Sequence, residues 1–156
     1  MKKRKPFDVI YEDNHLIIVN KAAGILVHED ITQDKTLEDY VKEYIKVKYE
    51  KPGDVFLGTI HRLDRPVSGV VVFARTSKAL TRMNEIFRKR DVQKTYWAIT
   101  SRKPEKKSGK LVHWLVKDSK ANTVKAYDHE VENGQKAELN YRYIGNINKY
   151  HLYFVI

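Results

Sequence analysis

One aspartate stands out for its chemistry in the segment GTIHRLDRPVSGVVVFAR, which spans residues 58–75. Asp64 lies between Arg62 and Arg65, His61 precedes them, and a run of apolar residues follows at once. An aspartate beside arginines is ionised at neutral pH, so Asp64 could act as a nucleophile or a base but not as an acid. Such carboxylates more often form structural ion pairs. A loop that leads into a buried strand favours the functional role.

A second candidate is Tyr96 in the segment KTYW. An aromatic residue in a strand usually packs in a core. A tyrosine ring can also stack on an unpaired base, as in proteins that turn a nucleotide out of its stack. Both roles stay open for Tyr96 on spacing alone.

Other chemistries have little support. The chain has no cysteine, which excludes disulfides, thiolate catalysis and cysteine zinc sites. None of the six histidines pairs with another at a short metal-ligand spacing, so we expect no metal site. HRLD differs in order from the HRDL of protein kinases, and the Walker A and GxSxG motifs are missing.

The chain is strongly basic. Its 156 residues include 30 lysines and arginines against 20 acids, a net charge of +10. This balance favours a polyanionic partner, usually nucleic acid, over a merely lysine-rich surface. No apolar run is long enough to cross a membrane, and the basic N-terminus lacks the apolar core of a secretion signal. We therefore expect a cytoplasmic protein without membrane contact.

The pattern of elements predicts an α+β fold with a largely antiparallel sheet. Residues 8–20 read as a hairpin and 37–49 as a helix capped by Thr36, with Asp39 as the partner in a capping box. Residues 68–75 form a strand that is apolar on both faces, which predicts a sheet covered on two sides. A second helix follows, capped by Ser77. Further strands are expected at 94–100, 111–116, 123–128, 137–144 and 150–156.

Four blocks together resemble the RluA-type pseudouridine synthases. HRLDRPVSGVVVFAR is similar to the family's signature, with Val67 where the family usually has threonine. The upstream segment VIYEDNHLIIVNKAAGILVH, and then FRKRDVQKTYWAIT and GKLVHWLVKD, resemble the family's other blocks in the family's order.

The resemblance implies an enzyme that isomerises uridine to pseudouridine in ribosomal or transfer RNA, without cofactor or metal. Asp64 matches the catalytic aspartate, Tyr96 the tyrosine that lies against the turned-out base, and Arg62 the arginine that fills the gap left in the RNA. His61, Leu63 and Lys94 match further substrate-binding positions. Whether the carboxylate attacks the base, attacks the sugar or removes a sugar proton stays open, as do the RNA, the modified uridine and the oligomeric state.

A later block of the family, Thr-Gly-Arg-x-His-Gln-Ile-Arg, does not occur before Ile156. Its arginine is expected to pair with the catalytic aspartate. We therefore expect residues 1–156 to be a catalytic domain that is incomplete at its C-terminus and inactive or nearly so. The resemblance also predicts no separate N-terminal RNA-binding domain. The alternatives are a non-catalytic RNA-binding module on the same fold and a lysine-rich, ribosome-associated structural protein.

Overall fold

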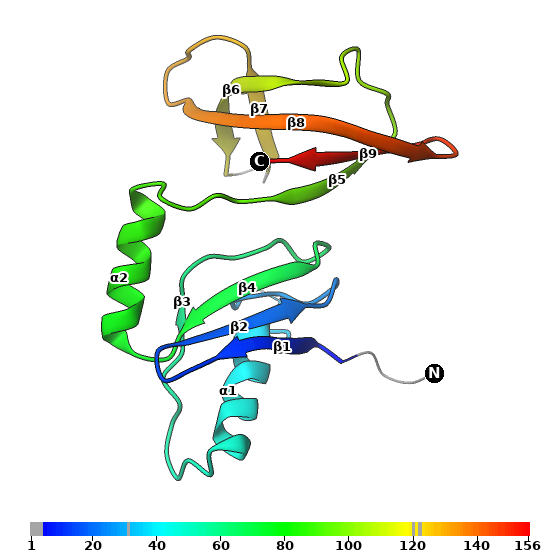
Figure 1. The fold of residues 1–156 in the computed structure, drawn as a ribbon. Coiled ribbons are helices and arrows are strands. Elements are labelled where there is room, and N and C mark those ends of the chain that lie inside the picture. The colour runs from blue at the N-terminus through cyan, green and yellow to red at the C-terminus, as the bar shows by residue number, and fades with distance from the viewer. Residues whose placement is uncertain (1–4, 31, 120, 122) are drawn as a thin grey trace. The chain divides into compact units, whose positions relative to one another are not determined.

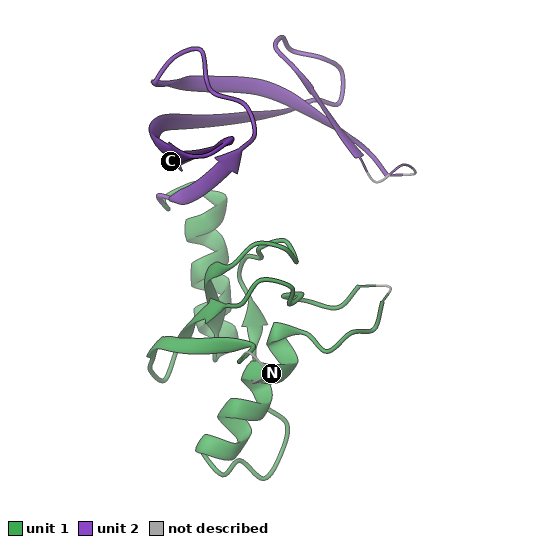
Figure 2. Cartoon of the chain, turned by 90° about the vertical axis from the view of Figure 1, so that its right-hand side faces the viewer, with its two compact units in different colours: residues 1–92 green, residues 93–156 purple. Residues whose placement is uncertain are grey.

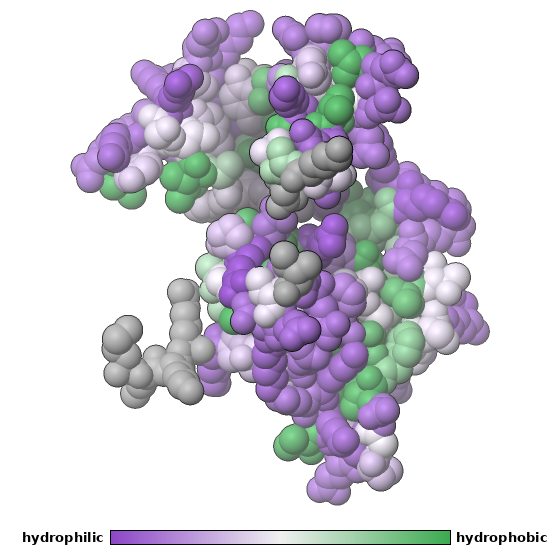
Figure 3. Space-filling model, turned by 180° about the vertical axis from the view of Figure 1, so that it is seen from behind, coloured by the Kyte–Doolittle hydropathy of each residue, from purple (hydrophilic) through white to green (hydrophobic). Residues whose placement is uncertain are grey.

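The computed structural model describes residues 5–30, 32–119, 121 and 123–156. The chain divides into two compact units, residues 1–92 and residues 93–156, which Figure 2 distinguishes by colour. On the face seen in Figure 3, hydrophilic side chains make up most of the surface, with separate hydrophobic groups between them. Each unit is described by itself below.

Unit 1 pairs a four-stranded antiparallel sheet with two helices. In chain order its elements are β1 (Phe7–Glu12), β2 (Leu16–Lys21), α1 (Leu37–Lys48), β3 (Gly58–Thr59), β4 (Gly69–Ala74) and α2 (Ser77–Arg88). The strand order is β1-β2-β4-β3 (Figure 1). The predicted hairpin is confirmed: at its turn the Asp13 carboxylate accepts hydrogen bonds from the backbone N–H groups of His15 and Leu16.

The core of unit 1 lies between α1 and one face of the sheet. Two cross-strand pairs of β2 and β4, Ile17 with Phe73 and Val19 with Val71, face α1. These side chains and Leu37, Val41 and Ile45 of α1 are fully buried. The opposite face of β4 is only partly covered: Val70 is 53% exposed. Ala74, on the same face as Val70, is nevertheless fully buried, so the prediction of a sheet covered on both sides holds for the α1 face and in part for the opposite face, among the described residues.

The helix boundaries follow from their caps. Thr36 and Asp39 form the predicted capping box at α1, in which each side chain bonds the other residue's backbone N–H. The cap of α2 is Thr76, whose hydroxyl accepts a hydrogen bond from the Ala79 N–H at 3.1 Å. The prediction of Ser77 as the cap was wrong by one residue. Thr76 keeps an extended backbone, whereas Ser77 is already helical.

Unit 2 is a five-stranded antiparallel sheet. Its strands are β5 (Tyr96–Thr100), β6 (Ser108–Asp118), β7 (Thr123–Tyr127), β8 (Gln135–Ile147) and β9 (Tyr150–Val155), in the order β5-β9-β8-β6-β7. All five predicted strands are confirmed, and β6 and β8 are longer than expected. Among the described residues of this unit only Tyr153 is buried, with 7% of its surface exposed. Its ring packs against those of Tyr141 and Tyr143.

The predicted α+β class is confirmed, with two sheets rather than one, each antiparallel throughout its described pairs. Within the described residues, no helix is both long and apolar enough to cross a membrane.

The cap of α2 gives the first testable prediction. Thr76→Ala removes the hydroxyl that satisfies the Ala79 N–H and should lower the free energy of unfolding by about 1 kcal/mol. Ser77→Ala is the matched control and should change it by less than about 0.5 kcal/mol. Urea denaturation followed by the helical circular dichroism signal measures both. Equal effects in the two variants would contradict the assignment of Thr76 as the cap.

Candidate active site

Burial alternates along the segment from His61 to Asp64. His61 and Leu63 are partly buried, whereas Arg62 and Asp64 are exposed. The sequence HRLD therefore presents its arginine and its aspartate outward and uses the other two side chains as anchors.

His61 ties this segment to the elements beside it. Its Nε2 accepts a hydrogen bond from the backbone N–H of Val72 in β4, at 3.1 Å. Its ring also stacks on that of Phe87 in α2, with the centroids 5.2 Å apart. An imidazole nitrogen that accepts cannot carry a proton. This geometry favours a positioning role for His61.

Leu63 is the second anchor and packs against the core of unit 1. A Cβ on Gly69 would lie 3.6 Å from Leu63 Cδ1, so the start of β4 passes close to this side chain. Gly69 has φ +139°, a conformation that strains any residue with a side chain. The glycine thus lets the chain turn from the loop into β4 while Leu63 stays in the core.

A buried lysine lies beneath the loop that carries Asp64. Lys21, at the end of β2, is 1% exposed. Its Nζ donates to the carbonyl oxygens of Ile25 at 2.7 Å, Ala22 at 3.2 Å and Arg65 at 3.3 Å. Burial lowers the pKa of Lys21, and the negative charge of Asp64 partly opposes that shift. One ammonium group therefore joins the loop after β2 to the residue next to Asp64.

Backbone contacts hold the same junction. The Arg65 carbonyl also accepts from the Gly24 N–H at 2.7 Å, and Gly24 has φ +90°, a conformation that favours glycine. The Val67 N–H donates to the Asp64 carbonyl at 3.0 Å and closes a turn. The backbone around Asp64 is thus fixed on both sides. Within the described residues, no hydrogen bond or ion pair engages the Asp64 carboxylate itself.

The cations that flank Asp64 in the sequence lie in different environments. Arg65 Nη2 lies 2.6 Å from Asp34 Oδ2, and Arg65 Nε donates to the Gly24 carbonyl. Its charge is therefore matched by a carboxylate. Because His61 points inward, Arg62 is the cation of this segment that remains directed toward solvent.

Arg62 lines a hollow of about 410 Å³ together with His28, Glu38, Leu57 and Thr59. Glu38 accepts from the hydroxyl of Thr59 at 3.1 Å and from His28 Nδ1 at 2.9 Å, and it pairs with Lys42. Burial raises the pKa of Glu38, but these bonds outweigh burial and keep its pKa below the ordinary value. The lining of the hollow thus includes a charge-balanced carboxylate.

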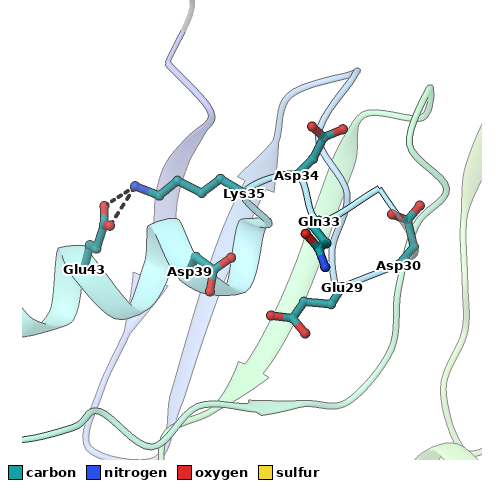
Figure 4. Close-up of a pocket in the computed structure, with 7 residues that line it drawn as sticks. All are labelled: Glu29, Asp30, Gln33, Asp34, Lys35, Asp39 and Glu43. Atoms are coloured by element: carbon teal, nitrogen blue, oxygen red, sulfur yellow. Dashed lines mark hydrogen bonds and ion pairs between the residues drawn. The ribbon is translucent and has the colours of Figure 1, made fainter.

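A second hollow, of about 560 Å³, is acidic (Figure 4). Its lining residues are Glu29, Asp30, Gln33, Asp34, Lys35, Asp39 and Glu43. Lys35 pairs with Glu43 at 2.6 Å, and Asp34 is the partner of Arg65. Five carboxylates against one lysine repel phosphate groups, so this hollow is a poor surface for RNA. Within the described residues, no group of three or more acids and histidines is placed to hold a metal ion.

Tyr96 and Lys94 belong to unit 2. Tyr96 is the first residue of β5 and is 41% exposed, and Lys94 lies in the exposed segment before that strand. Tyr96 and Tyr141 both pair with Val155 of β9, which puts the two tyrosines on one face of the sheet. The ring of Tyr96 is therefore accessible on its own unit. Asp64 and Tyr96 lie in different units and are not placed relative to each other.

Lys21 is the site residue that sequence reasoning missed. Its segment, VNK, lies within the first of the four blocks, but no site role was predicted for the lysine. The sequence did contain a signal, because Lys21 follows Ile17 and Val19 at alternate positions of β2. The structure shows that all three side chains are buried. A lysine at an inward position of an apolar strand indicates a buried, fully bonded ammonium.

The fold and the site define a protein that fits an established family. The family described as RNA pseudouridylate synthase matches residues 15–155. This chain belongs to that family, as the four sequence blocks predicted. The matched range contains both Asp64 and Tyr96.

Relatives with names of this kind match the chain in several bacteria. A ribosomal large subunit pseudouridine synthase C of Rickettsia felis is 31% identical over 90% of this chain and 44% of its own length. A tRNA pseudouridine synthase C of Vibrio cholerae is 38% identical over 59% of this chain and 36% of its own. An uncharacterized RNA pseudouridine synthase of Haemophilus influenzae is 31% identical over 67% and 43%. The chain thus spans less than half the length of these relatives.

A solved structure shares the fold. The human RNA pseudouridylate synthase domain containing 4 superposes with a TM-score of 0.76 at 24% identity, over 94% of this chain and 57% of the human chain. This likeness confirms the pseudouridine synthase fold.

Replacing Lys21 tests its role beneath the Asp64 loop. Lys21→Met keeps the length of the side chain but removes the donor that the carbonyls of Ala22 and Ile25 share, which should cost about 1–3 kcal/mol of stability at neutral pH. The matched control is Lys46→Met, at an exposed position of α1. Denaturant titration measures both variants. Equal small effects would contradict a structural role for the buried ammonium.

The stability difference between the wild type and Lys21→Met should also depend on pH. In the unfolded chain Lys21 keeps its proton up to its ordinary pKa of 10.5, whereas the folded protein releases it at lower pH. The unfolded state then binds more protons, so wild-type stability rises with pH in the window below 10.5. Lys21→Met lacks this contribution. The stability difference in favour of the wild type should therefore widen as the pH approaches 10.5. Denaturant titration at several pH values measures this difference, and a constant or shrinking difference would contradict the prediction.

Proposed function

We propose that this protein is an RNA pseudouridine synthase that isomerises uridine in ribosomal or transfer RNA, with Asp64 as its catalytic residue. The observation that carries the proposal is the exposed carboxylate of Asp64 on a loop fixed by buried groups, in a chain that belongs to this family. A rigid backbone with a free, ionised side chain suits a group that must meet a reacting atom. The names of the relatives support the substrate class.

The reaction balances within one nucleotide. The bond from ribose C1′ to uracil N1 breaks, the base rotates, and C1′ joins C5. The hydrogen on C5 leaves as a proton, and N1 gains one. Product and substrate are isomers, so the step consumes no oxidant, reductant or co-substrate. An ionised Asp64 serves whether it attacks the base, attacks the sugar or takes a sugar proton.

The other residues have roles that follow from their exposure. Tyr96 presents an accessible ring to stack on the turned-out uracil. Arg62 and Lys94 are exposed cations that can contact RNA. Leu63 and His61 support the segment from within. We further propose that residues 1–156 belong to one catalytic domain and that the protein acts in the cytoplasm.

Release of tritium from RNA labelled at C5 of uridine tests the role of Asp64, with the protein as its gene encodes it. Asp64→Asn keeps the shape but removes the charge, and the rate should fall by at least about 100-fold. Asp54→Asn, another exposed aspartate of unit 1, is the control and should retain the wild-type rate. Equal release by wild type and Asp64→Asn would reject the enzyme in favour of a non-catalytic RNA-binding module.

Tyr96→Ala tests the stacking role. Loss of one base stack costs about 1–3 kcal/mol, so binding of uridine-containing RNA should weaken by about 5- to 150-fold. Tyr150→Ala removes an equally accessible tyrosine at the start of β9 and should bind like the wild type. Fluorescence anisotropy with labelled RNA measures both. Indifference to Tyr96→Ala would favour the lysine-rich structural protein.

A further inference from the structure

The loop between β5 and β6 carries a cluster of positively charged side chains. Residues 102–107 hold four cations, Arg102, Lys103, Lys106 and Lys107, and one acid, Glu105. Among the described residues, no ion pair joins any of the four cations to a carboxylate. All four are exposed. This contrasts with Arg65 beside Asp64, whose charge is matched by Asp34.

The loop is held down by its carbonyl groups. The Arg102 carbonyl accepts from the hydroxyls of Thr100 at 2.7 Å and Tyr153 at 3.3 Å. The Lys106 carbonyl accepts from the Tyr141 hydroxyl at 3.4 Å, and the Lys107 carbonyl accepts from a β8 backbone N–H at 2.7 Å. The backbone oxygens are thus turned to the sheet, while the cationic side chains remain in solvent.

The loop crosses the face of the sheet that carries Tyr96. Tyr141 shares that face with Tyr96, because both pair with Val155. Tyr153 lies two residues before Val155 on β9 and therefore points to the same side. Since the loop rests on the hydroxyls of Tyr141 and Tyr153, its cations and the ring of Tyr96 belong to one face of unit 2. Figure 1 shows the loop between the ends of β5 and β6.

We propose that Arg102, Lys103, Lys106 and Lys107 form a pre-shaped contact for the RNA phosphate backbone, held in place by Tyr141 and Tyr153. This inference rests on the proposed function and adds where the backbone of the substrate binds. Unpaired lysines and arginines on an anchored loop bind phosphates without first breaking an ion pair or ordering a free chain. The ring of Tyr96 reads a base on the same face. Tyr141 and Tyr153 are positioning residues in this scheme.

Charge removal tests the phosphate-binding role. The variant Arg102→Gln, Lys103→Gln, Lys106→Gln, Lys107→Gln should bind a fluorescein-labelled RNA stem–loop, with uridines in its loop, at least about tenfold more weakly at about 0.1 M salt. The slope of log affinity against log salt should also become shallower, by about 0.7 for each phosphate that the variant no longer neutralises. The control Lys46→Gln, Lys51→Gln, Lys117→Gln, Lys125→Gln removes the same charge from exposed positions elsewhere. Equal changes in affinity and slope for both variants would overturn the proposal.

A second pair of variants tests the anchoring with every charge kept. Tyr141→Phe with Tyr153→Phe removes the two hydroxyls that hold the loop and should weaken RNA binding about three- to tenfold. Tyr143→Phe is the control, because its hydroxyl bonds Asn146 rather than the loop. Melting temperatures report the fold separately. Wild-type affinity in the double variant would remove the positioning role, and weaker binding at an unchanged melting temperature would support it.

Tritium release separates this inference from the proposed function. If RNA is isomerised and the loop variant binds like the wild type, the phosphate-binding role of the loop is wrong and the function stands. If the loop variant binds RNA more weakly but the wild type releases no tritium, the loop does bind phosphates and the protein is an RNA-binding module.

Discussion

The Asp64 loop depends on one buried ammonium group. Lys21 is almost fully buried and bonds three carbonyl oxygens, one of them on the residue that follows Asp64. A buried charge is costly unless its donors are all used, and here two chain segments far apart in sequence supply the acceptors. The same ammonium also offsets the charge of Asp64 from below. Lys21 thus helps to hold the loop that carries the candidate catalytic residue, together with the backbone bonds of Gly24 and Val67.

The four residues of the segment HRLD fall into two pairs with different roles. Two of its side chains enter the protein and fix the backbone, through the bond of His61 to Val72 and the packing of Leu63 on the core. The other two point outward. The contacts of His61 and Leu63 therefore indicate a positioning role, and the geometry does not require these two residues to bind the substrate. Support from within leaves the Asp64 carboxylate without a hydrogen bond or ion pair among the described residues, as the proposed catalytic role needs.

Much of the fold could be predicted from the sequence, because turns, helix caps and strands depend mainly on residues that are close together in the chain. The hairpin, the capping box of Thr36 and Asp39 and all strands of unit 2 follow from periodicity and turn residues. The capping residue of α2 was missed because Thr76 and Ser77 are both good caps, and only backbone conformation separates them. The pairing of Arg65 with Asp34 was also out of reach. It joins residues 31 positions apart, and spacing alone does not show such pairs.

Under the proposed function, the distribution of charge would let a basic chain hold a reactive acid and still attract RNA. Unit 1 places Asp64 near a paired Arg65 and an acidic hollow, so its local field is not strongly positive. Unit 2 carries twelve of the 30 lysines and arginines and only six of the 20 acids. Long-range attraction of a polyanion depends on this excess, whereas the ionised state of a carboxylate depends on its neighbours. Separating the two tasks means that the cations that recruit RNA need not be those that surround the aspartate. If one arginine both paired with the aspartate and bound phosphate, its ion pair with the aspartate would have to break each time a phosphate was bound.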